Sequence, residues 1–272
     1  MKISIITPNY NYANFIGKTI ESVVNQNYKN IEHIIVDDGS TDNSVEVIKS
    51  YQEKYPSRIK LIQQENTGQT TAINVGLRAA TGDIFGWINS DDYYNEDVFG
   101  LIIDCFKKET SVDAVFGDIG IIDKTNRVIR INKYLKFDYA SGVFNGFGKI
   151  IPSNAVFWKK ELTQQVGLLD ENFLYAMDSE YWSRLLFNRN VKKIKLVIAN
   201  FRWHPNAKTI KSHNKLSSDY VRAKTEGDII FRKSYLNLKI SRLIPYYFSK
   251  PIYIYYRSKR VLFRGIMGEY FK

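Results

Sequence analysis

The sequence predicts an α/β fold with a mostly parallel central sheet and helices on both of its faces. In the first half of the chain, short apolar runs alternate with stretches whose apolar residues recur at helical spacing, which is typical of strands that alternate with helices. The chain has 272 residues, 44% of them hydrophobic and 25% charged, so it has an ordinary globular composition and can bury a sizeable core. The single cysteine, Cys105, excludes an internal disulfide and a cysteine-based zinc site.

The first half contains strand-like and helix-like segments in strict alternation. Gly82 is expected to be the C-cap that ends the last of these helices. Right-handed crossovers place the carboxyl ends of such strands on one edge of the sheet, where ligands bind in open α/β sheets. The strands are predicted at residues 3–7, 31–36, 59–62 and 83–88, and the helices at 15–24, 44–54 and 70–80.

The pattern is looser in the second half. Residues 133–149 are rich in glycine and aromatic residues, and the sequence leaves open whether they form a mobile loop over a pocket or a well-packed surface loop. The other predicted elements are a strand at 113–116, a hairpin over 119–131 that turns at Lys124-Thr125-Asn126, strands at 150–158 and 191–199, and a helix at 180–187.

The net charge of +11 is concentrated near the C-terminus. Residues 233–272 hold nine Lys/Arg residues and one acidic residue, Glu269. At the other end, Thr7-Pro8-Asn9 ends the first apolar run too early for a signal peptide, and no stretch approaches the ~18 apolar residues that span a bilayer. We therefore expect a cytoplasmic protein.

Polar side chains follow each of the first four predicted strands. Because those strand ends meet at one edge of the sheet, the coincidence of all four clusters favours a ligand cleft there. The clusters are Thr7-Pro8-Asn9-Tyr10, Asp37-Asp38-Gly39-Ser40, Glu65-Asn66 and Asn89-Ser90-Asp91-Asp92.

The adjacent carboxylates of Asp91 and Asp92 have two interpretations. They repel each other at the end of an apolar run, and a divalent cation with hard oxygen ligands would relieve that repulsion. Alternatively, one of them caps a helix that begins near Asn95. From these residues alone the two interpretations are equally good.

The order and spacing of these motifs resemble the family 2 glycosyltransferases of the GT-A fold. The resemblance covers roughly residues 1–205 and implies a catalytic domain at 1–210 with a C-terminal basic and aromatic helical extension at 211–272. Besides the strand-end clusters, it rests on Asn66-Thr67-Gly68-Gln69, on Ala72, Asn74 and Gly76, on Ala80-Thr81-Gly82-Asp83, and on Met177-Asp178-Ser179-Glu180-Tyr181-Trp182-Ser183-Arg184-Leu185.

The resemblance implies a role for each matching residue. Asp178 would be the general base, with Glu180 as the fallback, although Asp178 could instead be the N-cap of a helix that begins near Ser179. Asp91 and Asp92, with His204, would bind a metal ion, although the usual Asp-x-Asp motif has Asn89 at its first position. Trp158, Glu180 and Trp182 would lie on the acceptor side. The nucleotide sugar would be held by Thr7, Pro8, Asn9, Tyr10, Asp37, Asp38, Asn66, Gln69, Asn89, Ser90 and Asp91.

The implied reaction is the inverting transfer of one sugar from a nucleotide-diphosphate donor, a UDP-sugar in particular, with Mn²⁺ or Mg²⁺ as cofactor. The acceptor would be a saccharide or a polyprenyl-linked saccharide in bacterial surface polysaccharide assembly. Arg202-Trp203 is similar to a motif of processive synthases, but Ala199 replaces their glutamine, which favours a single-sugar transferase. The alternatives are a sugar-phosphate nucleotidyltransferase and a non-catalytic sugar-nucleotide or glycan-binding protein.

The C-terminal residues 233–272 interleave tyrosines with Lys and Arg. This pattern suits a peripheral contact with an anionic membrane surface, where polyprenyl-linked acceptors lie. Single-stranded nucleic acid also binds basic and aromatic segments, but no RNA-binding signature is present and no nucleic-acid partner is expected. The remaining alternative is a helix that packs on the core.

Overall fold

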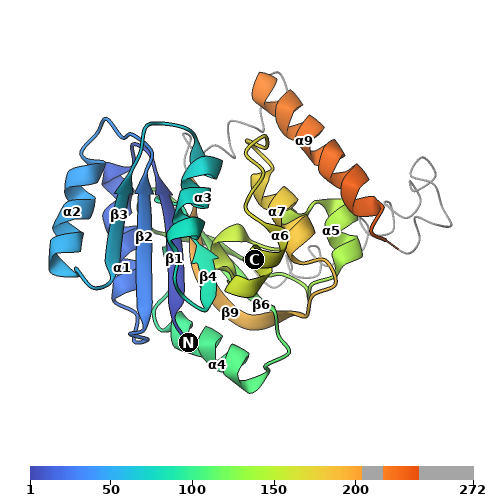
Figure 1. Cartoon of the computed structure of the whole chain (residues 1–272), viewed down its shortest axis with the longest axis horizontal. Coiled ribbons are helices and arrows are strands. Elements are labelled where there is room, and N and C mark those ends of the chain that lie inside the picture. Colours follow the sequence, from blue (N-terminus) through green and yellow to red (C-terminus); the bar gives the residue numbers. More distant parts are fainter. Residues whose placement is uncertain (204–216, 239–272) are drawn as a thin grey trace.

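The structure is a computed structural model that describes residues 1–203 and 217–238. Within these residues one sheet has the strand order β3-β2-β1-β4-β8-β6-β9-β5, and β7 pairs with β6 at its side (Figure 1). The strands are β1 (Ile3–Asn9), β2 (Ile31–Asp37), β3 (Ile59–Gln63), β4 (Ile84–Trp87), β5 (Tyr93–Tyr94), β6 (Ala114–Ile122), β7 (Val128–Asn132), β8 (Val156–Lys159) and β9 (Val191–Arg202).

The first four strands in this order are parallel, as the sequence predicts. Asn9 pairs with Asp37, and Asp37 pairs with Gln63, so the carboxyl ends of β1, β2 and β3 lie level at one edge. The mostly parallel expectation does not extend across the whole sheet, because β8 runs antiparallel to both β4 and β6. Beyond it, β6 and β9 are parallel again, and the short β5 runs antiparallel to β9.

Helices cover both faces of the sheet, which confirms the predicted α/β architecture. The alternation of β2 shows how the faces are shared: Ile35 packs in a cluster with α1 and α2, whereas Ile34 and Val36 pack with Ala72 of α3. The helices are α1 (Ala13–Val24), α2 (Ser44–Lys54), α3 (Gln69–Ala79), α4 (Val98–Lys108), α5 (Tyr139–Asn145), α6 (Lys160–Val166), α7 (Met177–Leu185) and α9 (Ser218–Tyr235).

Several predicted boundaries are wrong for reasons of tertiary packing. Helix α3 ends at Ala79 with Ala80 as its C-cap, so Gly82 is not a C-cap. A Cβ at Gly82 would lie 2.6 Å from Ser4 Oγ, so glycine is needed there for close approach to β1. The strand predicted at 150–158 begins only at Val156, after a 3₁₀ turn, η2 (Ser153–Ala155).

The glycine-rich segment 133–149 packs against the core. It contains α5 and a 3₁₀ turn, η1 (Phe147–Lys149), and the side chains of Val143, Phe144 and Phe147 are buried. Helix α9 packs on the same cluster through Ile230 and Tyr235, so the described part of the predicted extension lies against the core of the preceding residues. The predicted boundary at 210/211 and residues 239–272 lie outside the described residues. Among the residues that are described, no helix has the length and hydropathy needed to cross a membrane.

His33, in the middle of β2, is fully buried. Its Nε2 lies 2.8 Å from Thr7 Oγ1, and burial lowers the pKa of His33 to about 3. The folded state therefore excludes a proton that the unfolded chain binds below about pH 6.5, so stability falls as pH falls below that value. We expect the free energy of unfolding to drop by about 2 kcal/mol more between pH 7 and pH 5 than in His33→Gln. Urea unfolding of both proteins at the two pH values measures this, and parallel profiles would contradict it.

Candidate functional site

The residues after β1 form the first part of the sheet edge. Thr7 and Asn9 are buried, whereas Tyr10 is 43% exposed. The Thr7 hydroxyl contacts His33 inside the sheet, so this side chain does not face the edge. Asn9 donates from Nδ2 to Asp37 Oδ2 (2.8 Å) and to Ser40 Oγ (3.2 Å), while its buried Oδ1 has no partner. Of the residues predicted here, Tyr10 is the one that the structure leaves open to a ligand.

The two carboxylates after β2 hold loops in place. Asp37 accepts from the Ser40 backbone N–H (3.0 Å) and from its hydroxyl (2.6 Å). Asp38 accepts from the backbone N–H groups of Thr67 (2.9 Å) and Gly68 (2.8 Å). Both aspartates are buried, so they act first as anchors that shape the edge between β2 and α3.

The loop after β4 meets the loops of the other strands. Asn89 Oδ1 accepts from Gln69 Nε2 (3.0 Å), which brings the start of α3 to the end of β4. Ser90 donates to the Pro8 carbonyl (2.8 Å) and so ties the same loop to β1. Asn66 is exposed at the loop before α3. The structure thus gathers the four predicted polar clusters at one edge.

Asp92 is buried within this edge and does not cap a helix. It is 1% exposed, with Oδ1 accepting from the Arg202 backbone N–H (2.9 Å) and Oδ2 from Asn154 Nδ2 (3.1 Å). Burial, and then the neighbouring charge of Asp91, hold the pKa of Asp92 well above its usual range. Helix α4 begins at Val98 with Asp97 as its N-cap, so the alternative in which Asp91 or Asp92 caps a helix near Asn95 is wrong.

Arg202, at the end of β9, braces the Asp91-Asp92 turn. Its side chain is almost fully buried and donates from Nε to the Asp91 carbonyl (2.8 Å). The same guanidinium donates to the Asp123 carbonyl (3.0 Å) and to Asn126 Oδ1 (2.7 Å), both at the β6–β7 turn. The sequence indicates Arg202 only through its resemblance to a synthase motif and does not predict this bracing contact. His204 lies outside the described residues.

Asp178 lies in the first turn of α7. The helix begins at Met177 and its N-cap is Ala176, so the interpretation of Asp178 as an N-cap is wrong. Asp178 Oδ2 accepts from the Ser153 hydroxyl (2.8 Å), and Oδ1 accepts from the Ser179 backbone N–H (2.6 Å). Burial raises the pKa of Asp178, and these hydrogen bonds offset part of the increase. A carboxyl with a raised pKa is suited to general-base chemistry.

The 3₁₀ turn η2 links the buried carboxylate of Asp92 to the half-buried carboxylate of Asp178. Ser153 binds Asp178, and the next residue, Asn154, binds Asp92. Trp182 Nε1 donates to the same Ser153 oxygen (3.1 Å), so the hydroxyl is held between Trp182 and Asp178. Sequence reasoning missed both residues because it assigned 150–158 to a strand; the Ser-Asn pair inside an apolar run was the available signal.

The predicted acceptor-side tryptophans belong to the core. Trp158 and Trp182 are both 0% exposed, and Trp182 stacks on Trp87 with ring centroids 4.8 Å apart. Trp158 donates from Nε1 to Thr163 Oγ1 (2.8 Å). Neither side chain has exposed surface for a direct contact with an acceptor, and their place on the acceptor side stays a prediction. Their large apolar side chains pack against each other next to Ser153 and hold α7 on the core.

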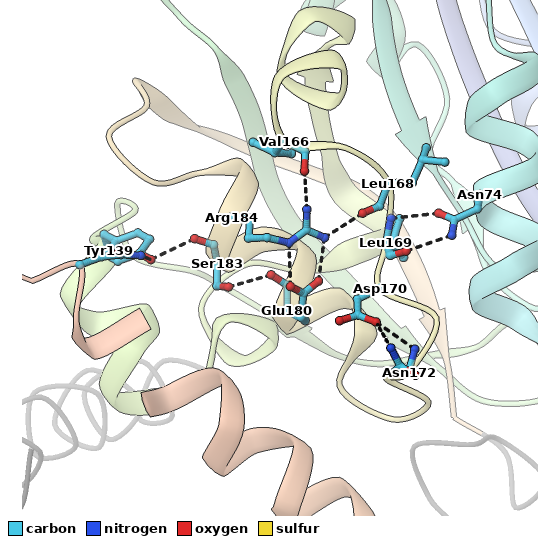
Figure 2. Close-up of polar contacts among 11 residues, drawn as sticks. Asn74, Tyr139, Val166, Leu168, Leu169, Asp170, Asn172, Glu180, Ser183 and Arg184 are labelled. Atoms are coloured by element: carbon cyan, nitrogen blue, oxygen red, sulfur yellow. Dashed lines mark hydrogen bonds and ion pairs between the residues drawn. The ribbon is translucent and has the colours of Figure 1, made fainter. Parts of the chain in front are cut away.

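Glu180 is committed to an ion pair. It accepts from Arg184 Nε (2.6 Å) and Nη2 (2.8 Å), and the same guanidinium donates to the carbonyls of Val166 and Leu168 (Figure 2). Asn74 of α3 exchanges two hydrogen bonds with the backbone of Leu169 in the same loop. Both of its oxygens are taken by Arg184 and the residue is 5% exposed, so the structure does not favour Glu180 as the fallback base.

Comparisons with known proteins show the family to which the chain belongs. The protein-family model described as "Glycosyl transferase family 2" matches residues 4–164. The minor teichoic acid biosynthesis protein GgaA of Bacillus subtilis is 30% identical over 190 residues, which cover 67% of this chain and 43% of that protein. The chain spans about two fifths of the length of the first curated relatives that it matches.

Solved structures show the same fold. Residues 1–349 of S. aureus TarS in complex with UDP-GlcNAc give a TM-score of 0.62 at 17% identity, covering 94% of this chain and 79% of that chain. The mannosyltransferase PcManGT from Pyrobaculum calidifontis, in complex with GDP-Man and Mn²⁺, gives 0.60 at 18% identity, covering 88% and 70%. With most of the sheet inside the matched region, the chain belongs to the family 2 glycosyltransferases.

Proposed function

We propose that this chain transfers one sugar from a nucleotide-diphosphate donor to a hydroxyl of a saccharide or polyprenyl-linked saccharide, with inversion at the anomeric carbon. The observation that carries the proposal is the link through η2, which joins Asp92 at the sheet edge to Asp178 on α7. A carboxylate at the donor end and a raised-pKa carboxylate at the acceptor end are what such a transfer needs.

In the proposed step the acceptor oxygen attacks the anomeric carbon while the bond from that carbon to the diphosphate oxygen breaks. Asp178 takes the acceptor proton, and the nucleoside diphosphate leaves with the electron pair of the broken bond. Asp178 carries no salt bridge among the described residues, so its carboxylate is free to be neutralised by the incoming proton. One base and no separate nucleophile correspond to a single displacement, which inverts the configuration.

The residues at the sheet edge fit a divalent cation that binds together with the donor. Among the described residues no group of three or more His, Cys, Asp and Glu side chains could hold a metal by itself. Mg²⁺ commonly binds through one or two carboxylates and the phosphates of the substrate, and Asp91 with Asp92 supply such a pair. Burial first, and then the charge of Asp91, raise the pKa of Asp92, and a cation beside the pair would favour its charged form.

We assign the two aspartates different parts. Asp92 is buried and held by Arg202 and Asn154, so it would set the shape of the turn and contribute charge from within. Asp91 would be the direct ligand, because its side chain is half-buried at the edge. When bound, Mn²⁺ or Mg²⁺ would neutralise the charge that develops on the departing diphosphate.

The donor class is supported by structures of the same fold that carry UDP-GlcNAc and GDP-Man, and UDP-sugars are our first choice. Assembly of a bacterial surface polymer is supported by the relative named for teichoic acid biosynthesis. The experiment is release of nucleoside diphosphate from a panel of UDP-, GDP- and dTDP-sugars with Mn²⁺ or with EDTA. Metal-dependent release from one donor would support the proposal. No release and no metal-dependent thermal stabilisation by any nucleotide would overturn it and favour a glycan-binding protein.

The basic residues of 233–272 support a second proposal, a reversible contact with an anionic membrane surface on the cytoplasmic side. Each cation near such a surface is worth about 1 kcal/mol, so a segment with nine Lys/Arg residues could hold the chain there. We expect the full chain to co-sediment with anionic but not with neutral liposomes. Equal sedimentation of a chain that ends at residue 238 would contradict the proposal.

A further inference from the structure

Helix α9 presents a row of polar side chains to the loop that leads into α7. Asp219, Arg222 and Glu226 are spaced three and four residues apart, so they share one face of the helix. This helix lies after the region matched by the family model, and Figure 1 shows it running past α7 and α5. The row faces residues 172–176, which end two positions before Asp178.

Glu226 provides the cap that α7 lacks. The N-cap residue of α7, Ala176, has no side chain that can accept a hydrogen bond. Glu226 is 5% exposed, and its carboxylate accepts from three consecutive backbone N–H groups, those of Leu174 (2.9 Å), Tyr175 (2.8 Å) and Ala176 (2.8 Å). Of these donors, the Ala176 N–H is one of the unpaired N–H groups at the helix start, and the other two belong to the loop before it. A buried carboxylate at this end of the helix is also favoured by the helix dipole.

The neighbours of Glu226 add further contacts to the same loop. Arg222 donates to Glu226 Oε1 (3.1 Å) and to the Asn172 carbonyl (3.3 Å). A hydrogen bond between the Tyr175 hydroxyl and Asp219 raises the pKa of Tyr175 to about 12. Residues 172, 174, 175 and 176 are therefore all attached to one face of α9.

The attachment determines where Asp178 lies. Its backbone follows from the path of 174–176, because α7 starts at Met177 and Asp178 is the second residue of the helix. On the other side, Asp178 is held by Ser153, and a Cβ at Gly148 would lie 3.1 Å from its Oδ2. A small shift of the helix start would thus break the Ser153 contact or close the space beside Gly148.

We propose that Glu226 is a positioning residue for Asp178, acting through the backbone of 174–176. The inference rests on the proposed function, because it assumes that Asp178 is the general base. It gives Glu226, and with it the one face of α9 that contacts residues 172–176, an indirect part in transfer.

The variant Glu226→Gln tests this proposal. The amide keeps the size of the side chain but turns one acceptor into a donor that faces backbone N–H groups. Since a misplacement of about 1 Å can cost about a hundredfold in rate, we expect kcat for nucleoside diphosphate release to fall about 10- to 100-fold. The KM for the donor selected by the panel should stay within about twofold, because the nucleotide residues are on other loops.

Matched variants separate positioning from loss of stability. Asp228→Asn removes the same charge from an exposed position on α9, and Ile230→Val loosens the packing of α9 on the core at a cost of about 1 kcal/mol. Both should keep the wild-type kcat. Tyr175→Phe removes only the contact with Asp219 and should lower kcat in the same direction but less than Glu226→Gln does.

The outcomes are distinct. A lowered kcat with an unchanged KM in Glu226→Gln and Tyr175→Phe, but not in the two controls, supports the inference. If Asp178→Asn is inactive, wild-type kcat in both Glu226→Gln and Tyr175→Phe overturns it. A fall in kcat of Ile230→Val that matches its fall in Tm overturns it too. Full activity of Asp178→Asn would remove the proposed function, and the inference with it.

Discussion

Asp178→Asn should lower kcat by about 10²- to 10⁴-fold, the usual contribution of a general base, while donor binding stays unchanged. The amide keeps the shape of the side chain but cannot accept the acceptor proton. The measurement is steady-state release of nucleoside diphosphate together with calorimetric titration of the donor. If this variant turned over as fast as an active wild type, Asp178 would be excluded as the base. If both proteins were equally slow, the non-catalytic alternative would be favoured.

The pH dependence of the wild type tests the same role. The base works only when it is deprotonated, and burial raises the pKa of Asp178. As the pH decreases, activity should therefore begin to fall at a pH above the range in which an ordinary aspartate titrates. The Ser153 hydrogen bond lowers that pKa. In Ser153→Ala the acidic limb of the kcat profile should therefore move to higher pH. An unchanged limb would mean that another group titrates.

Asp91→Asn should have the second large effect, and it should separate metal binding from folding. If Asp91 is the direct metal ligand, Mn²⁺ should no longer strengthen nucleotide binding, and kcat should fall about 10²- to 10³-fold because the charge on the leaving diphosphate is less well stabilised. The measurement is the dissociation constant of the nucleoside diphosphate with Mn²⁺ and with EDTA.

The same variant should also lose the stabilisation that metal and nucleotide give together. Burial and then the charge of Asp91 raise the pKa of Asp92, and a cation bound by Asp91 would offset that effect. We expect the rise in Tm on adding Mn²⁺ and nucleotide to disappear in Asp91→Asn. A full metal-dependent rise in Asp91→Asn would assign the ligand role to Asp92 or to another group.

The first half of the fold could be predicted in detail from the sequence. Helix α2 spans 44–54 as predicted, and β3 and α3 agree with the predicted 59–62 and 70–80 to within one residue. These segments have strong periodicity, so the pattern of the chain carries the information. The predicted site at the ends of β1, β2 and β4 follows from the same regularity, because parallel strands place their carboxyl ends together.

The second half depends on contacts that no local pattern encodes. The polar pair Ser153-Asn154 interrupts the apolar run 150–158, but it does not indicate that these side chains bind Asp178 and Asp92, which lie 25 and 62 residues away. The antiparallel direction of β8 also cannot be predicted from the local sequence, because strand direction is decided by the path of the chain through the whole sheet. The tryptophans at 158 and 182 could be assigned to the core only once their packing was visible.

The sequence by itself therefore determined the family, the α/β class and the set of polar residues at the sheet edge. Each of these depends on the identity and spacing of residues near one another along the chain. Tertiary structure alone decided which carboxylates are held by which partners: Asp92 by Arg202 and Asn154, Asp178 by Ser153, and the start of α7 by Glu226 of α9. Those pairings join residues up to 110 positions apart, and only the packing of helices and loops on the sheet brings them within hydrogen-bonding distance.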